Sequence, residues 1–244
     1  RIEGVATEGG AFGWGLSLQS GRPLGTPFDQ PTVLGRVDVS DVSGLGVLVD
    51  GGYVDFEDTT VQGVQSTDGA LGRGVQLQNW SAGTLLGLQS FDNHDAAVFL
   101  ESPGRPEGGP GDPVQAVTLE DCVLGPTADA DVPDSPGSFA ADGLTATQFV
   151  TSVPYPASTF RVVLDGTDLS GNARAHVLVE AITLEVGSNN VFGKGTTYPL
   201  AGQGDAVFQG IGGGPPPETP ALLDGGDALA INRAPVVLDD PSQP

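Results

Sequence analysis

Three similar segments fill the stretch from Gly46 to Leu124, and their repetition predicts the fold. Residues 46–50 (GVLVD) are followed by 54–61 (VDFEDTTV), residues 74–78 (GVQLQ) by 86–91 (LGLQSF), and residues 97–101 (AVFLE) by 117–122 (VTLEDC). Each segment has a small residue, a short alternating run, a turn and a second alternating run. Apolar residues at every second position are typical of β-strands. The stretch therefore predicts a repeated unit of two short strands.

Aligning the second runs, with further runs on either side, gives six rows. One column is apolar: Val39, Phe56, Leu88, Leu119, Leu164 and Val186. The residues that follow it are polar or glycine: Ser40, Glu57, Gln89, Glu120, Asp165 and Gly187. A column three residues later holds Val42, Thr59, Phe91, Cys122, Thr167 and Asn189. The rows are unequally spaced along the chain, which indicates a solenoid whose strands are fixed and whose turns vary in length.

The composition narrows the class of protein. The 38 glycines and 20 prolines of this 244-residue chain are compatible with a β-fold with many turns, because the apolar residues are grouped at period two. The formal charge of −22 disfavours binding to nucleic acid and to anionic lipid. No apolar run approaches the roughly 18 residues of a membrane span. The single cysteine excludes a disulfide framework and a zinc cluster, and we expect Cys122 in the core between Phe91 and Thr167.

The chain divides into two predicted regions. Residues 1–209 form an all-β solenoid, interrupted by a proline-bearing excursion at about 125–158. Residues 210–244 form a Pro/Gly-rich linker and a C-terminal tail that caps the stack. The first residues look like the inside of a strand, so we expect an excised piece of a longer, exported precursor whose targeting signal lies upstream.

Two rows resemble a known repeat. Residues 93–101 (NHDAAVFLE) and 169–179 (LSGNARAHVLV) each place an Asn-bearing turn before a small-Val-x-Leu strand. They resemble the right-handed parallel β-helix repeat of pectin-lyase-like proteins, and the overall character is similar to repeat-rich bacterial surface proteins. The resemblance covers about residues 37–202. It implies stacked parallel coils with an interior of like side chains.

The same resemblance raises an enzymatic reading, because many β-helix proteins are polysaccharide lyases or glycoside hydrolases. The most suggestive cluster is Asp92, His94 and Asp95, in which His94 would act as a general base oriented by a carboxylate. The alternative is a polar structural turn. Lys194, Arg161 and Arg174 are the remaining basic candidates for a lyase, whose uronate substrate the acidic surface would repel.

Two binding hypotheses remain. Asp129, Asp131 and Asp134 place three hard oxygen ligands within six residues, which suggests calcium, although the glycine and terminal glutamate of a helix-loop-helix site are missing. A lateral groove beside Gln76, Gln78 and Gln89 would suit a polysaccharide.

The sequence therefore predicts a non-enzymatic, cell-surface or extracellular β-helix with a structural or adhesive role. Its expected partners are further copies of the chain, joined end to end, or other surface proteins. A polysaccharide-active enzyme or a carbohydrate-binding module is the alternative.

Overall fold

The computed structural model describes residues 1–4, 13–19, 31–66, 71–106, 114–127, 142–148, 156–194 and 196–231. In these ranges the chain forms β-strands and two 3₁₀ turns, η1 (Ala157–Thr159) and η2 (Gly225–Asp227). Three parallel sheets contain all of these strands except one short antiparallel hairpin, β12 (Arg105–Pro106) with β13 (Val114–Gln115). The chain is therefore all-β, as predicted.

The sheets, which we name A, B and C, are given with their strands in spatial order. Sheet A contains β1 (Ile2–Glu3), β4 (Asp38–Ser40), β7 (Thr60–Gln62), β10 (Gln89–Phe91) and β15 (Val123–Leu124). Sheet B contains β2 (Gly13–Gln19), β5 (Gly44–Asp50), β8 (Arg73–Gln78), β11 (Ala96–Glu101), β16 (Asp142–Thr147), β18 (Ala175–Glu180), β20 (Tyr198–Gln203) and β22 (Ala221–Leu223). Sheet C contains β3 (Thr32–Gly35), β6 (Tyr53–Glu57), β9 (Ala82–Leu86), β14 (Val117–Glu120), β17 (Arg161–Asp165), β19 (Thr183–Val186) and β21 (Val207–Gly210).

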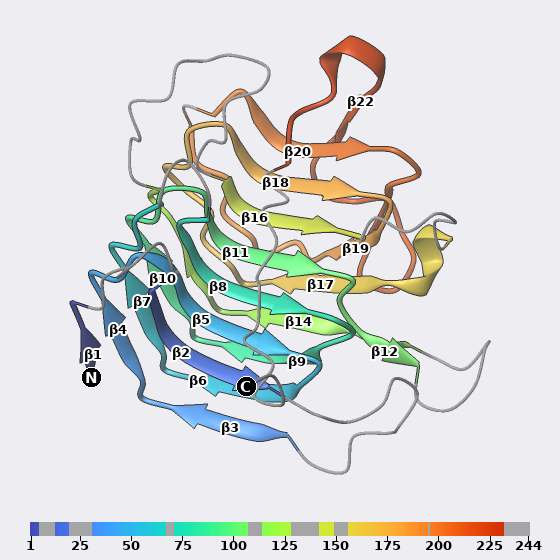
Figure 1. The fold of residues 1–244 in the computed structure, drawn as a ribbon. Helices are drawn as coiled ribbons and strands as arrows, with labels where there is room; N and C mark the ends of the chain where they lie inside the picture. Colours follow the sequence, from blue (N-terminus) through green and yellow to red (C-terminus); the bar gives the residue numbers. More distant parts are fainter. Residues whose placement is uncertain are drawn as a thin grey trace.

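The chain visits the sheets in turn and then repeats the circuit. From β2 in sheet B it passes to β3 in sheet C and β4 in sheet A, and it returns to sheet B as β5, which pairs in parallel with β2. We call one such circuit a coil. Figure 1 shows the strands of sheet B stacked from β2 near the N-terminus to β22 at the opposite end. This topology is compatible with the expected parallel β-helix.

The interior is filled by ladders of like side chains. In sheet C, Phe56, Leu85, Leu119, Leu164 and Val186 occupy equivalent positions of successive strands and are at most 1% exposed. Phe56, Leu119, Leu164 and Val186 confirm four rows of the predicted column. The other two rows were wrong.

Those two rows belong to other parts of the coil. Val39 lies in β4 of sheet A, and Leu88 lies after β9, so Leu34 and Leu85 take their places in sheet C. The error has a physical cause, because apolar alternation recurs on all three sides of the coil. A run from one sheet can thus be aligned with a run from another.

The buried thiol of Cys122 confirms its predicted place in the core. Cys122 is 1% exposed and its Sγ–H donates to the Leu85 carbonyl oxygen over 2.9 Å. Burial raises the pKa of this thiol to about 11, so it stays protonated and unreactive at neutral pH. Its neighbour in the preceding coil is Leu88, because Glu120 pairs with Leu86; the predicted neighbour Phe91 belongs to sheet A.

A single left-handed residue turns the chain at the corner after each of several sheet C strands. These residues, with φ between 49° and 64°, are Arg36, Asp58, Gly87, Asp121 and Gly166. Glycine adopts this conformation freely, and aspartate tolerates it better than most residues. The many Gly and Asp residues of the sequence thus have a structural use, because sharp corners let each strand stack on its equivalent.

The segment predicted as an excursion differs from expectation in part. Its residues 142–147 form β16, which pairs with β11 on one side and β18 on the other, so the stack of sheet B runs through them. The flanking prolines indicated a break in the stack, although residues 142–147 (DGLTAT) contain alternating apolar and polar side chains. The hairpin β12–β13 lies earlier in the chain, between β11 and β14.

The C-terminal region returns to sheet B after its Pro/Gly-rich stretch. Strand β22 pairs with β20, and residues 228–231 then pack beside sheet B, with Leu229 and Ile231 against Leu178 and Ala201. Residues 232–244 lie outside the described ranges.

Candidate functional site

Polar and charged side chains gather on the outer face of sheet B. In β8, Val75 and Leu77 belong to the core, so the alternating Gln76 and Gln78 point away from it. The Arg73 guanidinium lies on this outer side, since its Nη1 donates to Gln76 Oε1 over 2.5 Å. All three polar residues are at most 6% exposed, which is unusual for such side chains and makes this face the natural candidate site.

The first ion pair on this face joins two neighbouring coils. Arg73 Nε donates to Asp95 Oδ2 over 2.9 Å, and the two side chains are 1% and 8% exposed. The guanidinium carbon also lies 3.5 Å from the centroid of the Phe99 ring. Such cation–π stacking partly replaces the water that burial removes from the arginine.

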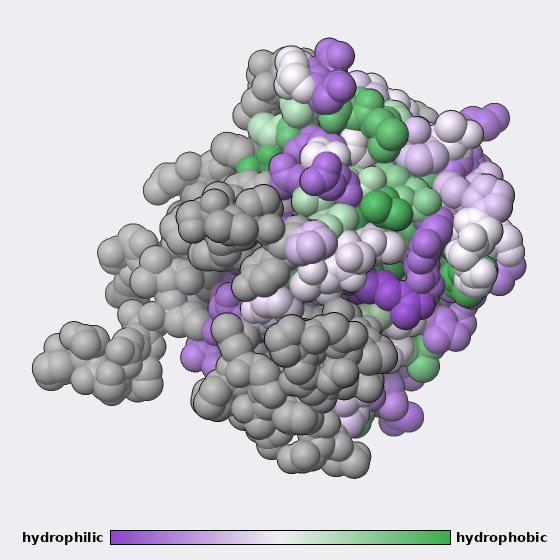
Figure 2. Space-filling model, turned by 90° about the vertical axis from the view of Figure 1, so that its right-hand side faces the viewer, coloured by the Kyte–Doolittle hydropathy of each residue, from purple (hydrophilic) through white to green (hydrophobic). Residues whose placement is uncertain are grey.

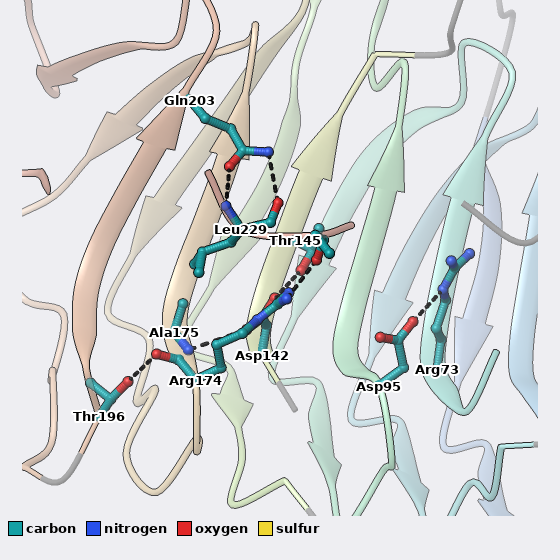
Figure 3. A network of polar contacts seen from close by, with 10 residues as sticks. Arg73, Asp95, Asp142, Thr145, Arg174, Ala175, Thr196, Gln203 and Leu229 are labelled. Atoms are coloured by element: carbon teal, nitrogen blue, oxygen red, sulfur yellow. Dashed lines mark hydrogen bonds and ion pairs between the residues drawn. The ribbon is translucent and has the colours of Figure 1, made fainter. Parts of the chain in front are cut away.

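The second ion pair lies further along the same face and is bidentate. Arg174 Nε and Nη2 donate to Asp142 Oδ1 and Oδ2 over 3.0 and 2.5 Å. Thr145 and the Ala175 amide also donate to the Asp142 carboxylate. Figure 3 shows both pairs projecting from the strands of sheet B. We call Arg73, Asp95, Asp142 and Arg174 the charge cluster.

The four charges of this cluster balance. Burial raises the pKa of Asp95, and the Arg73 charge and hydrogen bond oppose that shift. Burial acts to lower the pKa of Arg174. The charge of Asp142 and its hydrogen bonds to Arg174 have a larger, opposite effect, so the pKa of Arg174 is raised. Both arginines therefore have a carboxylate within hydrogen-bonding distance, and neither carboxylate is left as an unpaired buried charge.

Amide side chains extend the network along the sheet. Gln76 Nε2 donates to Gln78 Oε1 over 2.6 Å, and Gln78 Nε2 donates to Asp50 Oδ1 over 3.3 Å. Near the other end, Thr147 and Gln203 donate to the two oxygens of Glu180. The Gln76–Gln78 bond lies within β8, whereas the bonds to Asp50 and Glu180 join different strands of sheet B and so cross-link successive coils.

The three residues of the predicted catalytic cluster, Asp92, His94 and Asp95, lie in different environments. Asp92 is exposed at a corner with φ 54°. His94 is half-buried, and its Nδ1 accepts a hydrogen bond from the Ser66 amide over 3.3 Å. Asp95 is paired with Arg73. His94 and Asp95 thus have different hydrogen-bond partners, although they are adjacent in sequence.

The predicted metal and polysaccharide sites involve other residues. Asp129, Asp131 and Asp134 lie outside the described residues, so calcium there stays a prediction. In the ranges that are described, no group of three or more His, Cys, Asp or Glu side chains could hold a metal ion. Gln89 lies in sheet A, whereas Gln76 and Gln78 lie in sheet B, so the three glutamines do not share one sheet; the groove predicted between them and the long excursion stays a prediction.

The basic candidates have separate places as well. Arg161 pairs with Glu185 on sheet C, and this pair lowers the pKa of the Glu185 carboxyl. Lys194 is exposed, and Arg174 belongs to the charge cluster. Sequence reasoning missed Arg73 and Asp142 altogether. Their places at the starts of β8 and β16, two equivalent strands, are a signal that could have suggested them.

A hollow of about 340 Å³ lies near the C-terminal end of sheet C. Its polar lining includes Asp165, Ser188 and Asn189, and its apolar lining includes Ile211 and Pro215. Oδ1 of Asp165 is buried and has no hydrogen-bond partner among the described residues. Asp165 therefore lines the hollow, whereas its Oδ1 itself is enclosed by the protein.

The charge cluster is a network of paired charges. Each carboxylate is held by a guanidinium within hydrogen-bonding distance. The guanidiniums and amides still have directional N–H groups, which can hold a neighbouring backbone in place.

No protein-family model, curated protein or solved structure matches the chain. Its architecture is compatible with a parallel β-helix. In the described part of the chain, no helix has the length and apolar character needed to cross a membrane.

The buried His176 should make stability depend on pH. The residue is 0% exposed, and burial lowers the pKa of its imidazole against the opposing effects of the Gly193 carbonyl and Asp168. In the unfolded chain the pKa returns to about 6.5. As the pH falls through that value, the unfolded state binds a proton that the folded state does not, so the free energy of unfolding decreases.

Below pH 6.5, His176 should lower the free energy of unfolding by up to about 1.4 kcal/mol for each pH unit. Urea denaturation between pH 7.5 and 5.5 measures it. His176→Leu should flatten the profile, whereas His94→Gln, at a less buried histidine, should retain most of it. An unchanged slope in the His176 variant would refute this assignment. Protonation of Glu185 lowers the free energy of unfolding in a separate pH range. Because the pKa of Glu185 is lowered in the folded protein, this loss of stability occurs below pH 4.5.

Proposed function

We propose that this chain is part of a right-handed parallel β-helix of the pectin-lyase-like kind, serving as a structural or adhesive element on a bacterial cell surface or outside the cell. The observation that carries the proposal is the charge cluster, whose carboxylates and guanidiniums satisfy one another and brace neighbouring coils. The acidic composition suits an exposed, soluble surface.

The ends of the stack support assembly with other copies or other surface proteins. Among the described residues, β3 pairs with β6 alone and β21 with β19 alone, so each leaves one edge of sheet C available. Val33 in β3 is 55% exposed, and Val207 in β21 is 44% exposed. Strand edges of this kind are templates for pairing with another chain. Figure 2 also shows apolar and hydrophilic patches alternating on one side of the molecule.

Light scattering coupled to size exclusion tests the assembly. We expect the mass of the wild-type chain to rise with concentration, and that of Val33→Lys to stay monomeric because a charged edge strand resists pairing. Leu86→Lys, with the same charge change at an exposed apolar residue of the central strand β9, is the matched control and should behave as wild type. A constant monomeric mass for wild type up to millimolar concentration would exclude self-assembly.

A carbohydrate-binding or carbohydrate-active role is the second candidate, and the hollow beside Asp165 favours it. Sugar hydroxyls could hydrogen-bond to the polar residues in its lining, Asp165, Ser188 and Asn189. Calorimetry with neutral and uronate oligosaccharides would give saturable heat with wild type and at least tenfold weaker binding with Asp165→Ala. Absence of heat with wild type at millimolar ligand would remove this candidate.

A further inference from the structure

The outer face of sheet B near its C-terminal end is covered by an extended segment of the chain itself. We call residues 228–231 the tail segment. Leu229 and Ile231, two residues apart, pack against an apolar cluster: Ala175, Leu178, Ala201 and Leu223, with Tyr198 and Ala221 at its margin. Alternate side chains of an extended peptide point the same way, so this spacing puts both apolar residues on the sheet.

The polar contacts of the tail segment involve its backbone. Gln203 Nε2 donates to the Leu229 carbonyl over 3.1 Å, and the Leu229 amide donates to Gln203 Oε1 over 2.9 Å. Arg174 Nη1 donates to the Ala230 carbonyl over 2.5 Å. Figure 3 shows Gln203 directed at both backbone groups of Leu229. A primary amide that satisfies both groups of one residue recognises a peptide in an extended conformation.

The receiving side chains are also held by contacts that do not involve the tail segment. Arg174 is held by its bidentate pair with Asp142, and Thr145 donates to the same carboxylate. Gln203 also donates to Glu180. Because these contacts are internal to sheet B, the surface does not need the tail segment to keep its shape. It has the properties of a preformed peptide site.

The connection to the tail segment is weakly held. Residues 224–227, between β22 and the segment, are all exposed. A Cβ atom added at Gly225 or Gly226 would meet nothing within 4 Å. This glycine hinge can change direction without breaking β22 or its pairing with β20.

We propose that this surface, defined by Arg174, Leu178, Ala201 and Gln203, is a docking site for the tail segment of a second copy of the chain, which replaces the chain's own segment when the hinge opens. The contacts would be the same in both cases, because the donor, acceptor and apolar groups are identical. A chain's own tail segment has an advantage over that of a second copy, because its short tether is equivalent to a local concentration of about millimolar. Docking of a second copy's segment should therefore be detected once the contact of each chain with its own segment is removed.

A complementation experiment with the full chain tests the proposal. The acceptor variant, Leu229→Ser with Ile231→Ser, keeps the site and loses the segment's apolar contacts. The donor variant, Ala201→Asp with Gln203→Ala, keeps the segment and loses the site. Both carry Val33→Lys, which suppresses pairing through β3, so the result is independent of end-to-end assembly. Each should be monomeric alone, and their equimolar mixture at several hundred micromolar should approach twice the monomer mass by light scattering.

The matched control is a chain that carries all four site and segment substitutions together with Val33→Lys. Mixed with the acceptor, it should leave the mass at the monomer value. If Ala201→Asp prevents folding, Gln203→Ala alone serves as the donor, since it removes the paired amide contacts and, besides them, only the hydrogen bond to Glu180. A mixture of folded donor and acceptor that stays monomeric, as judged alongside unchanged thermal melts, would overturn the proposal.

Discussion

Replacing Arg73 with Ala is expected to lower the free energy of unfolding by about 3–5 kcal/mol, because the buried carboxylate of Asp95 then loses its counter-charge. Arg73 is 1% exposed, so its removal also leaves a cavity and ends the contact with Phe99. Urea denaturation followed by circular dichroism gives the value. This is one of two strong effects that the fold implies.

Two further variants separate charge from packing at this position. Replacing the pair together, Arg73→Met with Asp95→Leu, should recover stability to within about 1–2 kcal/mol of wild type, because neither an ion nor a large void remains. Arg161→Ala, at an ion pair whose arginine is 45% exposed, should cost about 1 kcal/mol or less. Equal losses from Arg73→Ala and Arg161→Ala would contradict the burial of the charge cluster.

The second strong effect is expected at Gly83, where two coils approach closely. A Cβ atom there would lie 1.7 Å from the Val54 carbonyl oxygen, and the residue has φ 140°. Backbone must therefore move to admit even a methyl group. Gly83→Ala should cost about 3–5 kcal/mol, the sum of a steric and a conformational penalty.

Gly214 is the matched control for that substitution. A Cβ atom added at Gly214 meets nothing within 4 Å, and its φ lies outside the left-handed region. Gly214→Ala should leave the free energy of unfolding within about 0.5 kcal/mol of wild type. Thermal and urea melts of the two variants side by side measure the difference. A loss below 1 kcal/mol for Gly83→Ala would show that sheet C does not stack as described.

The strands of sheet C were predictable because their pattern is local. In β14 and β17 a core residue occupies every second position, as at Val117 and Leu119. Such alternation needs only neighbouring residues, and the buried place of Cys122 followed from it. Which side of the coil a run belongs to depends on corner geometry, and Val39 and Leu88 were misplaced for that reason.

The charge cluster could not be predicted in the same way, because stacking creates it. Asp95 pairs with Arg73 and Asp142 with Arg174, residues that lie one strand apart along sheet B. Nothing in the sequence around Asp95 identifies its partner, and its turn resembled a catalytic constellation instead. The sequence gives the sign of each charge, but identifying the partner of each charge requires the register of neighbouring strands in sheet B.

The register is therefore the central claim, and a disulfide measures it directly. Thr118 and Val163 face each other on neighbouring strands of sheet C, and Val163 is followed by Glu185 one strand further. Neighbouring strands lie about 4.8 Å apart, within the range that a disulfide bridges, whereas the next strand lies beyond about 7 Å. Peptide mapping by mass spectrometry after mild oxidation should find an intramolecular bond in Thr118→Cys/Val163→Cys and free thiols in Thr118→Cys/Glu185→Cys. Free thiols in the first pair, or a bond in the second, would contradict the stacked coils.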